Sequence, residues 1–358
     1  IKQLTEKSPK LVIRTILKIS MYAIKYLKKH DYAVIKNAVE LTKKLGKGGM
    51  AGFVNAFLRK FVDFKFEFPK KEDEYISIKY SYPLFAVREL LKKYNKERVE
   101  NILSYKNEKS TLAFYDINGE QYLKEKDIEY EKTPYDNVFF VKNFTRNEDY
   151  DKGLYTFQNI GTVAICDAVP DCENLLDSCS APGGKSVRLS YKVNNVLALD
   201  IHEHRVELIK DYYTRMKREN IIAKVEDASV FNSEYKNKFD VVLCDVPCSG
   251  LGVTFDNPDI KLFREENDYL SLQKEQISII TNCSNYVKVG GCLIYSTCSI
   301  FDRENIAIIK SFMSNIKGFK IEKIDSKLPC EVVDNTNYYL PDISFGAGFF
   351  VCKLKRIK

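Results

Sequence analysis

Two cysteines lie where the sequence predicts loops after buried strands, and thiols at such positions can do covalent chemistry. Cys248 lies in the segment DVPCSG, which begins at Asp245, and Cys298 lies in the segment YSTCS, which begins at Tyr295. A thiol becomes a nucleophile when its surroundings lower its pKa, whereas a cysteine inside an apolar run is usually an inert buried group. We therefore take Cys248 and Cys298, and not the cysteines within apolar runs, as candidates for a nucleophilic site.

A loop rich in small residues follows another predicted strand. The segment LLDSCSAPGGKS covers residues 175–186, and in it Gly183 and Gly184 follow a proline. Glycine tolerates positive φ and has no Cβ, so a ligand can approach the backbone where the first N–H groups of a helix are unpaired. Open α/β sheets bind nucleotides in loops of this kind. The loop lacks the spacing of a P-loop and of the G-x-G-x-x-G motif, and alone it fits a tight turn that binds nothing equally well.

Four acidic residues stand at the ends of successive predicted strands: Asp177, Asp200, Asp227 and Asp245. One such aspartate would be an ordinary turn residue, but the carboxyl ends of parallel strands face one crevice, so the four acids are expected to converge there. Asp200 lies 16 residues after Gly184, where an acid can accept hydrogen bonds from ribose hydroxyls. The pattern indicates a nucleoside-containing cofactor. Because no phosphate-binding lysine loop accompanies it, this cofactor need not carry phosphates.

Alternating strands and helices are predicted after Gly153, which is typical of a parallel sheet with helices on its faces. The predicted strands cover Asn174–Cys179, Val196–Asp200, Ala223–Glu226, Phe239–Asp245, Cys292–Thr297 and Phe349–Lys355. The predicted helices cover Glu203–Glu219, Glu265–Val287 and Arg303–Ser314. Gly290 and Gly291 are expected to end the longest helix before its following strand. Residues 153–358 are thus predicted to form an α/β domain.

The first part of the chain has helical periodicity instead. Apolar residues recur at helical spacing over Lys10–Lys29, Tyr32–Leu45 and Gly49–Phe61, which predicts a helical domain over residues 1–65. Residues 66–152 are predicted to form a small connecting α+β domain. Its predicted segments are a linker over Phe64–Tyr80, helices over Leu84–Tyr94, Glu97–Leu103 and Glu120–Lys124, and strands over Thr111–Asp116 and Asn137–Lys142.

Charge is unevenly distributed along the chain. Residues 1–110 carry 25 Lys and Arg against 12 Asp and Glu, a net charge of +13, so the other 248 residues carry −6 of the total of +7. A basic module joined to a mildly acidic one indicates a polyanionic partner held mainly by the first part, and a lysine-rich solvated surface is the alternative.

Composition excludes several classes of protein. No apolar run is long enough to span a bilayer and the first residues do not resemble a secretory signal, so we expect a cytoplasmic protein with no membrane contact. The 10 cysteines form no C-x-x-C pair, which disfavours both a metal cluster and a disulfide framework. No sustained heptad is present, and we expect a monomer. Because the chain starts at Ile1 and not at Met, we expect it to begin inside a longer polypeptide.

The motifs DSCSAPGGK, DVPCSG and YSTCS, in this order and spacing, resemble those of the RNA cytosine-5 methyltransferases. The segments Asn257–Lys261 and Gly346–Phe350 also match that family. Upstream, Phe53–Arg59 resembles the NusB-like RNA-binding domain of the bacterial branch that modifies small-subunit ribosomal RNA, the Sun or RsmB group. The resemblance covers nearly the whole chain. It implies a Rossmann-like sheet dependent on S-adenosylmethionine, preceded by a helical NusB-like domain and a small α+β domain.

The resemblance also implies roles for the candidate residues. Cys298 as a thiolate adds to cytosine C6, C5 then takes the methyl group of S-adenosylmethionine, and Cys248 assists release of the product. Asp245 supplies a hydrogen bond at the methionine end of the cofactor or at cytosine N3, and Lys185 contacts the base or the cofactor. Asp200 holds the ribose. The other cofactor residues implied are Asp227 at the adenine amino group and the loop Cys179, Ser180, Ala181, Pro182, Gly183, Gly184 and Lys185 beneath the methionine part.

Two departures from the family pattern stand out. The family usually has Gln-Asp before the first strand, whereas this chain has Gln158 and Asn159, so a role for that acid is in doubt. The helical domain is shorter than expected, as if its first helices lay before Ile1, and this would weaken RNA binding.

Three functions remain open from the sequence. The first is methylation of cytosine C5 in 16S rRNA, free or in an early ribosomal particle, without a metal. The second keeps the chemistry but acts on transfer RNA or on DNA. If the substrate is DNA, the resemblance to DNA cytosine-5 methyltransferases implies that Cys248 replaces Cys298 as the nucleophile. The third is a non-catalytic RNA-binding assembly factor, against which the intact Cys298, Cys248 and Asp245 argue.

Overall fold

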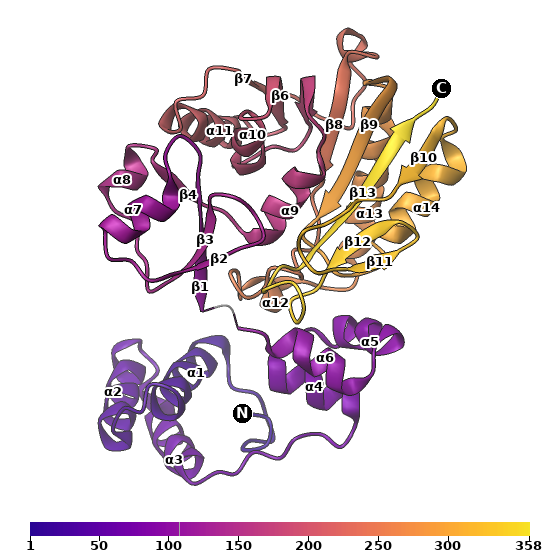
Figure 1. The fold of residues 1–358 in the computed structure, drawn as a ribbon. Helices are drawn as coiled ribbons and strands as arrows, with labels where there is room; N and C mark the ends of the chain where they lie inside the picture. The colour runs from indigo at the N-terminus through magenta and orange to yellow at the C-terminus, as the bar shows by residue number, and fades with distance from the viewer. Residues whose placement is uncertain (107) are drawn as a thin grey trace. The chain divides into compact units, whose positions relative to one another are not determined.

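The computed structural model describes residues 1–106 and 108–358, which form two compact units, Ile1–Lys70 and Lys71–Lys358 (Figure 1). The predicted small α+β segment and the predicted α/β segment both lie within the second unit. The division into three domains at residues 65 and 152 stays a prediction.

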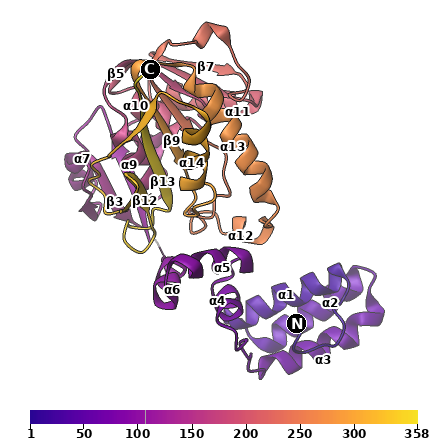
Figure 2. The same ribbon diagram turned by 90° about the vertical axis from the view of Figure 1, so that its right-hand side faces the viewer.

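The first unit is a small helical bundle. Its helices are α1 (Leu11–Lys25), α2 (Asp31–Lys44) and α3 (Ala51–Val62), with a 3-10 turn over Gly48–Met50 before α3. The view in Figure 2 shows the three helices packed together. Apolar residues three and four apart on each helix form one buried cluster that includes Ile13, Ile16, Leu17, Ile35, Val54, Phe57 and Leu58. The three predicted helices are confirmed to within a few residues.

The second unit begins with three helices: α4 (Glu72–Tyr80), α5 (Leu84–Lys93) and α6 (Lys96–Ser104). The prediction of a linker over Phe64–Tyr80 was wrong for the residues of α4. This helix has acidic residues in its first turn, where they suit the helix dipole, and it ends at Ser81, which has φ 56°. Only Ile76 of the helix is buried, so α4 has no clear apolar periodicity.

A small antiparallel sheet follows the three helices, in the order β2-β3-β1-β4. Its strands are β1 (Lys109–Phe114), β2 (Tyr130–Lys132), β3 (Val138–Lys142) and β4 (Tyr155–Phe157), with helices α7 (Gly119–Glu125) and α8 (Glu148–Asp151) between them. β1, β3 and α7 were predicted; β2, β4 and α8 were not, because each is only three or four residues long.

The main sheet contains nine strands in the order β11-β12-β13-β9-β8-β5-β6-β7, with β10 paired to β13. The strands β5 to β9 are parallel to one another, and β10 to β13 are antiparallel to their neighbours. The parallel strands are β5 (Cys172–Asp177), β6 (Val193–Asp200), β7 (Ile221–Val225), β8 (Phe239–Asp245) and β9 (Val287–Thr297). The antiparallel strands are β10 (Phe319–Glu322), β11 (Glu331–Val333), β12 (Thr336–Tyr339) and β13 (Phe349–Arg356).

Helices cover both faces of this sheet (Figure 1). Val241 and Leu243 of β8 pack in the core with α9 (Ile160–Ala168), α10 (Gly184–Leu189) and α11 (Glu203–Arg215). Val242 and Cys244, which point the opposite way, pack in the core with α13 (Asp268–Ser284) and α14 (Ile306–Asn315). A short helix α12 (Ile260–Phe263) precedes α13. Burial on both faces explains why β8 is apolar from Val241 to Cys244, and it confirms the predicted doubly covered α/β fold.

The two glycines near the start of β9 have a different role from the predicted one. α13 ends at Ser284, and Gly290 and Gly291 lie within β9, so they do not cap the helix. A Cβ on Gly291 would lie 2.6 Å from the carbonyl oxygen of Asp240, and the register between β8 and β9 shifts at this place. The pair therefore belongs to a bulge in which the backbones approach closely.

No helix in the described part of the chain is long and apolar enough to cross a bilayer.

The two-sided core predicts a stability difference between two leucines. Leu243 is fully buried in the central strand β8, whereas Leu270 on α13 is 62% exposed. Leu243→Ala should lower the free energy of unfolding in urea by about 2–5 kcal/mol, because it leaves a cavity between sheet and helices. Leu270→Ala should change it by about 0.5 kcal/mol or less. Equal effects of the two substitutions would contradict this packing.

Candidate active site

The ends of four neighbouring strands bring the candidate residues to one edge of the main sheet. In the parallel ladders, Asp177 lies beside Ala198 and Leu243, and Asp245 lies beside Ser296. Asp200 closes β6, and Asp227 follows the end of β7 by two residues. The predicted convergence of strand ends is therefore present in the fold.

The first of these acids is a structural anchor for the glycine-containing loop. Asp177 is fully buried, and it accepts a hydrogen bond of 2.7 Å from the hydroxyl of Ser186. Ser186 also lies 2.7 Å from the hydroxyl of Ser180, so the strand, the loop and α10 are tied together. Burial raises the pKa of Asp177 to about 6, although the Ser186 bond opposes the shift.

Close packing fixes the loop from Cys179 to Lys185. Gly183 has φ 103°, and a Cβ there would lie 3.2 Å from the Cα of Ile209 on α11, so both the backbone and the space favour glycine. The carbonyl of Gly184 accepts a 2.9 Å hydrogen bond from Gln158, and the carbonyl of Ala181 accepts one of 3.3 Å from Arg205. The loop is thus held from outside, by side chains of neighbouring segments.

Two loop members differ in their surroundings. Burial raises the pKa of the Cys179 thiol well above its usual range, so this cysteine is a packing group. Ser180 is buried, and its hydroxyl contacts that of Ser186. Pro182 lies between Ala181 and Gly184, whose carbonyls accept the two hydrogen bonds described above. The loop therefore offers mainly backbone atoms to a ligand.

A close ion pair joins the loop to the end of β8. The ammonium of Lys185 lies 2.6 Å from one carboxylate oxygen of Asp245, and the side chains are only 15% and 23% exposed. The other oxygen of Asp245 accepts a 2.6 Å hydrogen bond from Ser296 on β9. Burial alone would lower the pKa of Lys185, but the attraction of Asp245 outweighs it and the net shift is upward. Lys185 therefore stays charged near neutral pH.

The two candidate thiols lie next to each other. The Sγ atoms of Cys248 and Cys298 are 3.0 Å apart, although the residues are separated by 50 positions in the chain. Contact with Cys298 and burial raise the pKa of Cys248 well above its usual range. Cys248 is thus a neutral thiol near pH 7, and it can donate its proton to a hydrogen bond on the sulfur of Cys298.

Glycines let the two cysteine loops approach. The N–H of Gly252 donates a 3.0 Å hydrogen bond to the carbonyl of Cys298. A Cβ on Gly252 or on Gly348 would overlap the backbone of the other residue. The C-terminal segment Gly346–Phe350 thus belongs to this site, because its second glycine is required for the close approach.

Asp200 and Asp227 lie further along the same edge. Asp200 is buried, and its carboxylate accepts from the N–H of His202 and lies 3.2 Å from the guanidinium of Arg205. Asp227 accepts hydrogen bonds of 2.8 Å and 2.7 Å from the N–H and hydroxyl of Ser229. Asp227 also borders a hollow of about 380 Å³, lined by Glu226, Val230, Phe231, Asn232 and Ser233.

Gln158 and Asn159, where the sequence departs from the resembled pattern, have defined contacts. Gln158 is buried between the loop carbonyl of Gly184 and the hydroxyl of Tyr115. The side-chain amide of Asn159 donates a 3.2 Å hydrogen bond to Asp256. Asn159 therefore supplies a donor where an aspartate would place a second negative charge beside Asp256.

Several polar residues at this site were missed by the sequence analysis. Glu304, Asn305, Gln276 and Arg264 all make hydrogen bonds to the cysteine loops. The available signal was the serine that follows each cysteine, since two buried hydroxyls in facing loops need a common partner. In the part of the chain described, no group of three or more His, Cys, Asp and Glu is arranged to hold a metal ion.

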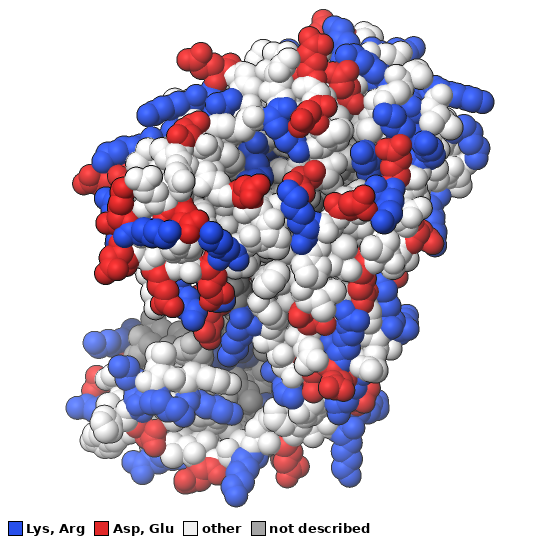
Figure 3. All heavy atoms as spheres, viewed as in Figure 1, with Lys and Arg blue, Asp and Glu red and all other residues white. Residues whose placement is uncertain are grey.

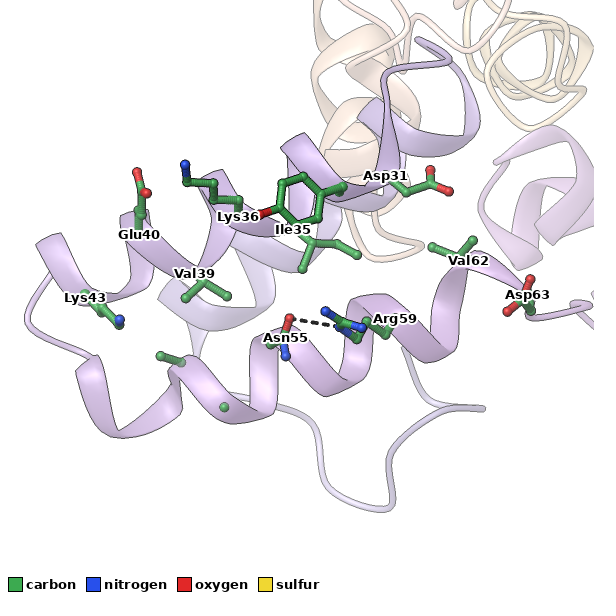
Figure 4. A pocket seen from close by; sticks show the side chains of 13 residues that line it. Asp31, Ile35, Lys36, Val39, Glu40, Lys43, Asn55, Arg59, Val62 and Asp63 are labelled. Atoms are coloured by element: carbon green, nitrogen blue, oxygen red, sulfur yellow. Dashed lines mark hydrogen bonds between the residues drawn. The ribbon is translucent and has the colours of Figure 1, made fainter.

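The helical unit offers a groove of its own, between α2 and α3 (Figure 4). It has a volume of about 810 Å³. Asn55 and Arg59, from the segment that resembles NusB-like domains, face the groove and form a 3.3 Å hydrogen bond, while Val54, Phe57 and Leu58 of the same segment are buried. The segment thus has one face for the core and one for a partner.

Positive charge predominates in this unit. Residues 1–70 carry 16 Lys and Arg against 5 Asp and Glu, a net charge of +11. Blue side chains outnumber red ones on the face of the unit shown in Figure 3. Such an excess favours contact with a polyanion.

Comparison with known proteins matches both units. A model of the family described as 16S rRNA methyltransferase RsmB/F matches residues 165–355, which is more than half of the chain, and a model of the NusB family matches residues 2–63. The "Probable ribosomal RNA small subunit methyltransferase B" of Bacillus subtilis (strain 168) is 31% identical, over 95% of this chain and 82% of its own length. The ribosomal RNA small subunit methyltransferase B of Pasteurella multocida is 27% identical, over 100% and 84%.

Solved structures share the fold. The crystal structure of PH0851 has a TM-score of 0.84 and 21% identity, and the match covers 99% of this chain and 85% of that one. The crystal structure of NSun6 from Pyrococcus horikoshii with SFG has a TM-score of 0.66 and 16% identity, and the match covers 81% and 99%. At these identities the similarity establishes the Rossmann-like fold.

The buried carboxyl group of Asp177 predicts a pH-dependent stability. Its pKa of about 6 lies above the ordinary 3.8, so the folded state binds this proton more tightly than the unfolded state. The resulting stabilisation is complete below about pH 4 and is lost as the pH rises through about 6. Asp177→Asn, which cannot lose a proton, should therefore gain stability relative to the wild type by up to about 3 kcal/mol between pH 4 and pH 7.

Urea unfolding at several pH values measures this gain. Asp325→Asn is the matched control, because the side chain of Asp325 is 89% exposed. A difference between wild type and Asp177→Asn that stays constant with pH would show that Asp177 does not titrate in this window.

Proposed function

Because the chain belongs to the RsmB/F family of 16S rRNA methyltransferases, we propose that it methylates carbon 5 of an unpaired cytosine in 16S rRNA. As a member of this family it is an rRNA methyltransferase that depends on S-adenosylmethionine. The observation that carries the finer proposal is the pair of thiols, Cys248 and Cys298, 3.0 Å apart at the strand-end edge. Two adjacent thiols suit a reaction in which one attacks the base and the other assists its release.

The proposed reaction uses Cys298 as a temporary covalent partner of the base. The Cys298 thiolate adds to C6, and the π electrons of the 5,6 double bond move so that C5 becomes nucleophilic. S-adenosylmethionine supplies an electrophilic methyl group, which C5 takes. A base then removes the remaining proton of C5, the 5,6 double bond forms again, and the C6–S bond breaks to return the Cys298 thiolate.

The state of Cys248 supports this assignment of the two thiols. Its pKa is raised by Cys298 and by burial, so it retains its proton where the nucleophile must be a thiolate. As a donor to the Cys298 sulfur, Cys248 stabilises negative charge on that sulfur, which is present before attack and returns on release. The reverse assignment, with Cys248 as nucleophile, requires ionisation of a thiol whose pKa its surroundings raise.

The Lys185–Asp245 pair is proposed to orient the cytosine and to balance charge. Both oxygens of Asp245 already have partners, Lys185 and Ser296, so the carboxylate has a fixed direction. A fixed carboxylate can accept from the cytosine amino group or from a protonated N3, and protonation of N3 offsets the charge that attack at C6 creates. The nearby ammonium of Lys185 keeps Asp245 from adding an uncompensated negative charge beside the thiolate.

The remaining strand-end residues fit a nucleoside that carries an amino acid part. Val230 and Phe231 are large exposed apolar residues, 61% and 51% exposed, in the hollow beside Asp227. We assign the adenine to this hollow, its amino group to Asp227, and the ribose hydroxyls to Asp200. The loop from Cys179 to Lys185 is assigned to the methionine part, since its Gly183 and Gly184 expose backbone. These acids also suit the positive sulfonium of the donor.

RNA binding is assigned mainly to the helical unit. Cytosine C6 is inaccessible in a stacked helix, so the target base must be unpaired or rotated out. The net charge of +11 over residues 1–70 and the groove beside Asn55 and Arg59 suit an RNA backbone.

Thiol variants test the reaction. With labelled S-adenosylmethionine and unmodified 16S rRNA, Cys298→Ala should reduce methyl transfer by at least about 1000-fold, because no covalent adduct can form. Cys248→Ala should still attack the base but release it slowly, so that a protein–RNA adduct accumulates on denaturing gels. Cys172→Ala, at the end of β5 that lies away from the site, is the control.

The opposite result, an active Cys298→Ala and an inactive Cys248→Ala, would overturn the assignment. If the protein methylated transfer RNA but not 16S rRNA, either free or in a small-subunit particle, the proposed substrate would be wrong.

Cofactor binding gives an independent test. Asp200→Ala should weaken S-adenosylmethionine binding by about 10- to 100-fold, because a charged acceptor of the ribose hydroxyls is lost. Titration calorimetry measures the dissociation constant, with the exposed Asp325→Ala as control. An unchanged dissociation constant in Asp200→Ala would show that Asp200 does not bind the ribose hydroxyls.

A further inference from the structure

We propose that Glu304 is a positioning residue that sets the distance between the two active-site thiols. The inference rests on the proposed function for the roles of Cys248 and Cys298. Glu304 touches neither sulfur, and it lies just before α14, six residues after Cys298. Its carboxylate instead binds the residue that follows each cysteine.

One carboxylate links the two loops. Oε2 of Glu304 accepts hydrogen bonds of 2.6 Å from the hydroxyls of both Ser249 and Ser299. Oε1 accepts a 2.7 Å hydrogen bond from the N–H of Ser249. Ser249 follows Cys248 and Ser299 follows Cys298, so a shift of either loop would break a bond to the same group.

Neighbouring side chains complete this arrangement. Gln276 donates from its amide to Oε1 of Glu304 at 3.2 Å and to the carbonyl of Pro247 at 2.8 Å. The residues before and after Cys248 are therefore both held. We call Glu304, Gln276 and Asn305 the thiol clamp.

Asn305 holds the other loop in the same way. Its side chain accepts a 2.6 Å hydrogen bond from the hydroxyl of Thr297 and donates one of 2.9 Å to the carbonyl of Ser299. Asn305 is the N-cap residue of α14, where an asparagine side chain usually bonds to its own helix, but here it makes no such bond. The Asn305 side chain thus binds the residues on both sides of Cys298, and it does not cap α14.

The burial of Glu304 shows why a carboxylate is used. Glu304 and Asn305 are both 0% exposed. Among the described residues no Lys or Arg forms an ion pair with Glu304, so its charge depends on the four hydrogen bonds from the loops and Gln276. An acceptor-only group forces all four donors to point inward, which an amide or hydroxyl would not do. All four hydrogen bonds to Glu304 therefore form together in one arrangement of the loops, and in it the two thiols are in contact.

The clamp acts on the step that both thiols share. Attack and release need Cys298 in line with C6 and Cys248 within reach of the same sulfur. A displacement of about 1 Å at a reacting group can reduce a rate by about 100-fold. Removing Glu304 should therefore affect turnover far more than cofactor binding, because the proposed cofactor residues Asp200 and Asp227 lie at the ends of β6 and β7.

Kinetics of Glu304 variants test the proposal. Glu304→Ala should lower kcat for methyl transfer by about 100-fold, with the KM for S-adenosylmethionine changed by about 2-fold or less. Glu304→Gln retains an oxygen for the Ser249 N–H but has an amide nitrogen where Oε2 accepts from both hydroxyls, so it should restore only part of the rate. Glu304→Ala leaves buried donors unpaired and can impair folding. The double variant Ser249→Ala/Ser299→Ala is milder, because it removes only the two hydroxyls that donate to Glu304. It should also lower kcat.

A matched control separates positioning from stability. Asn220 also bridges two segments, by hydrogen bonds of 2.9 Å and 3.0 Å to the carbonyls of Ser190 and Val193, but at the opposite end of β6. Asn220→Ala should lower the melting temperature without lowering kcat of the folded protein. A full rate in the folded double variant and in Glu304→Ala would overturn the clamp.

A thiol measurement on the free protein does not depend on the RNA reaction. Diamide oxidises two adjacent thiols to a disulfide and takes up their two hydrogens. Mass spectrometry of the Cys248–Cys298 peptide should show cross-linking about 10-fold slower in Glu304→Ala than in wild type, because the effective concentration of one thiol at the other falls. Equal rates would overturn the clamp. If wild type cross-links in a Glu304-dependent manner but transfers no methyl group to any RNA, the proposed function fails and the clamp stands.

Discussion

Coverage of the main sheet by helices on both faces leaves only its strand ends for polar chemistry. Along β8, Val241 and Leu243 pack on one side and Val242 and Cys244 on the other, so the strand carries no polar side chain between Asp240 and Asp245. The same constraint acts on β5 and β9, which end at Asp177 and Thr297. Parallel pairing then places these ends at one edge, and residues distant in sequence meet there without any direct signal between them.

This constraint makes every charge at the edge depend on its partners. Lys185 keeps its charge because its ammonium lies 2.6 Å from the carboxylate of Asp245, which raises the pKa of Lys185. Asp177, with a hydroxyl as its partner, has a raised pKa because a single neutral donor does not replace lost hydration. Glu304 has four donors and, among the residues that the structure describes, no ion-pair partner. The three buried or partly buried acids thus have three kinds of partner: a lysine, a hydroxyl, and a set of four donors. Of the three, Asp245 alone is partly exposed, so that a ligand can reach it.

The sequence predicted the parts of this fold that follow from apolar patterning. Phe239–Asp245 was predicted with the bounds that β8 has, because an apolar run buried on both faces ends abruptly at an acid. The Gly290–Gly291 pair was misjudged because a bulge and a helix cap both favour glycine, and only the pairing of β8 with β9 separates them. Helix α4 was missed because one buried residue, Ile76, gives no period.

At the site, the sequence predicted positions better than interactions. The cysteine loops were identified from their place after strands, and the structure brings their thiols into contact. The partners Glu304 and Gln276 were not identified. Gln276 lies in α13 and Glu304 just before α14, in two segments that the sequence predicted only as ordinary helices. A hydrogen bond between distant segments leaves no periodic trace in either of them. Individual roles, such as those of Asp200 and Asp227, stay predictions for the same reason.

The division of charge between the two units follows from opposite demands on the two substrates. A positively charged sulfonium donor favours acids at the strand ends, and residues 71–358 carry 40 Lys and Arg against 44 Asp and Glu, a net charge of −4. An RNA backbone is repelled by such a surface at long range. In the proposed function, the net charge of +11 over residues 1–70 is the source of the attraction for RNA. Binding and chemistry can therefore each use the charge they require, because they are placed on separately folded parts of the chain.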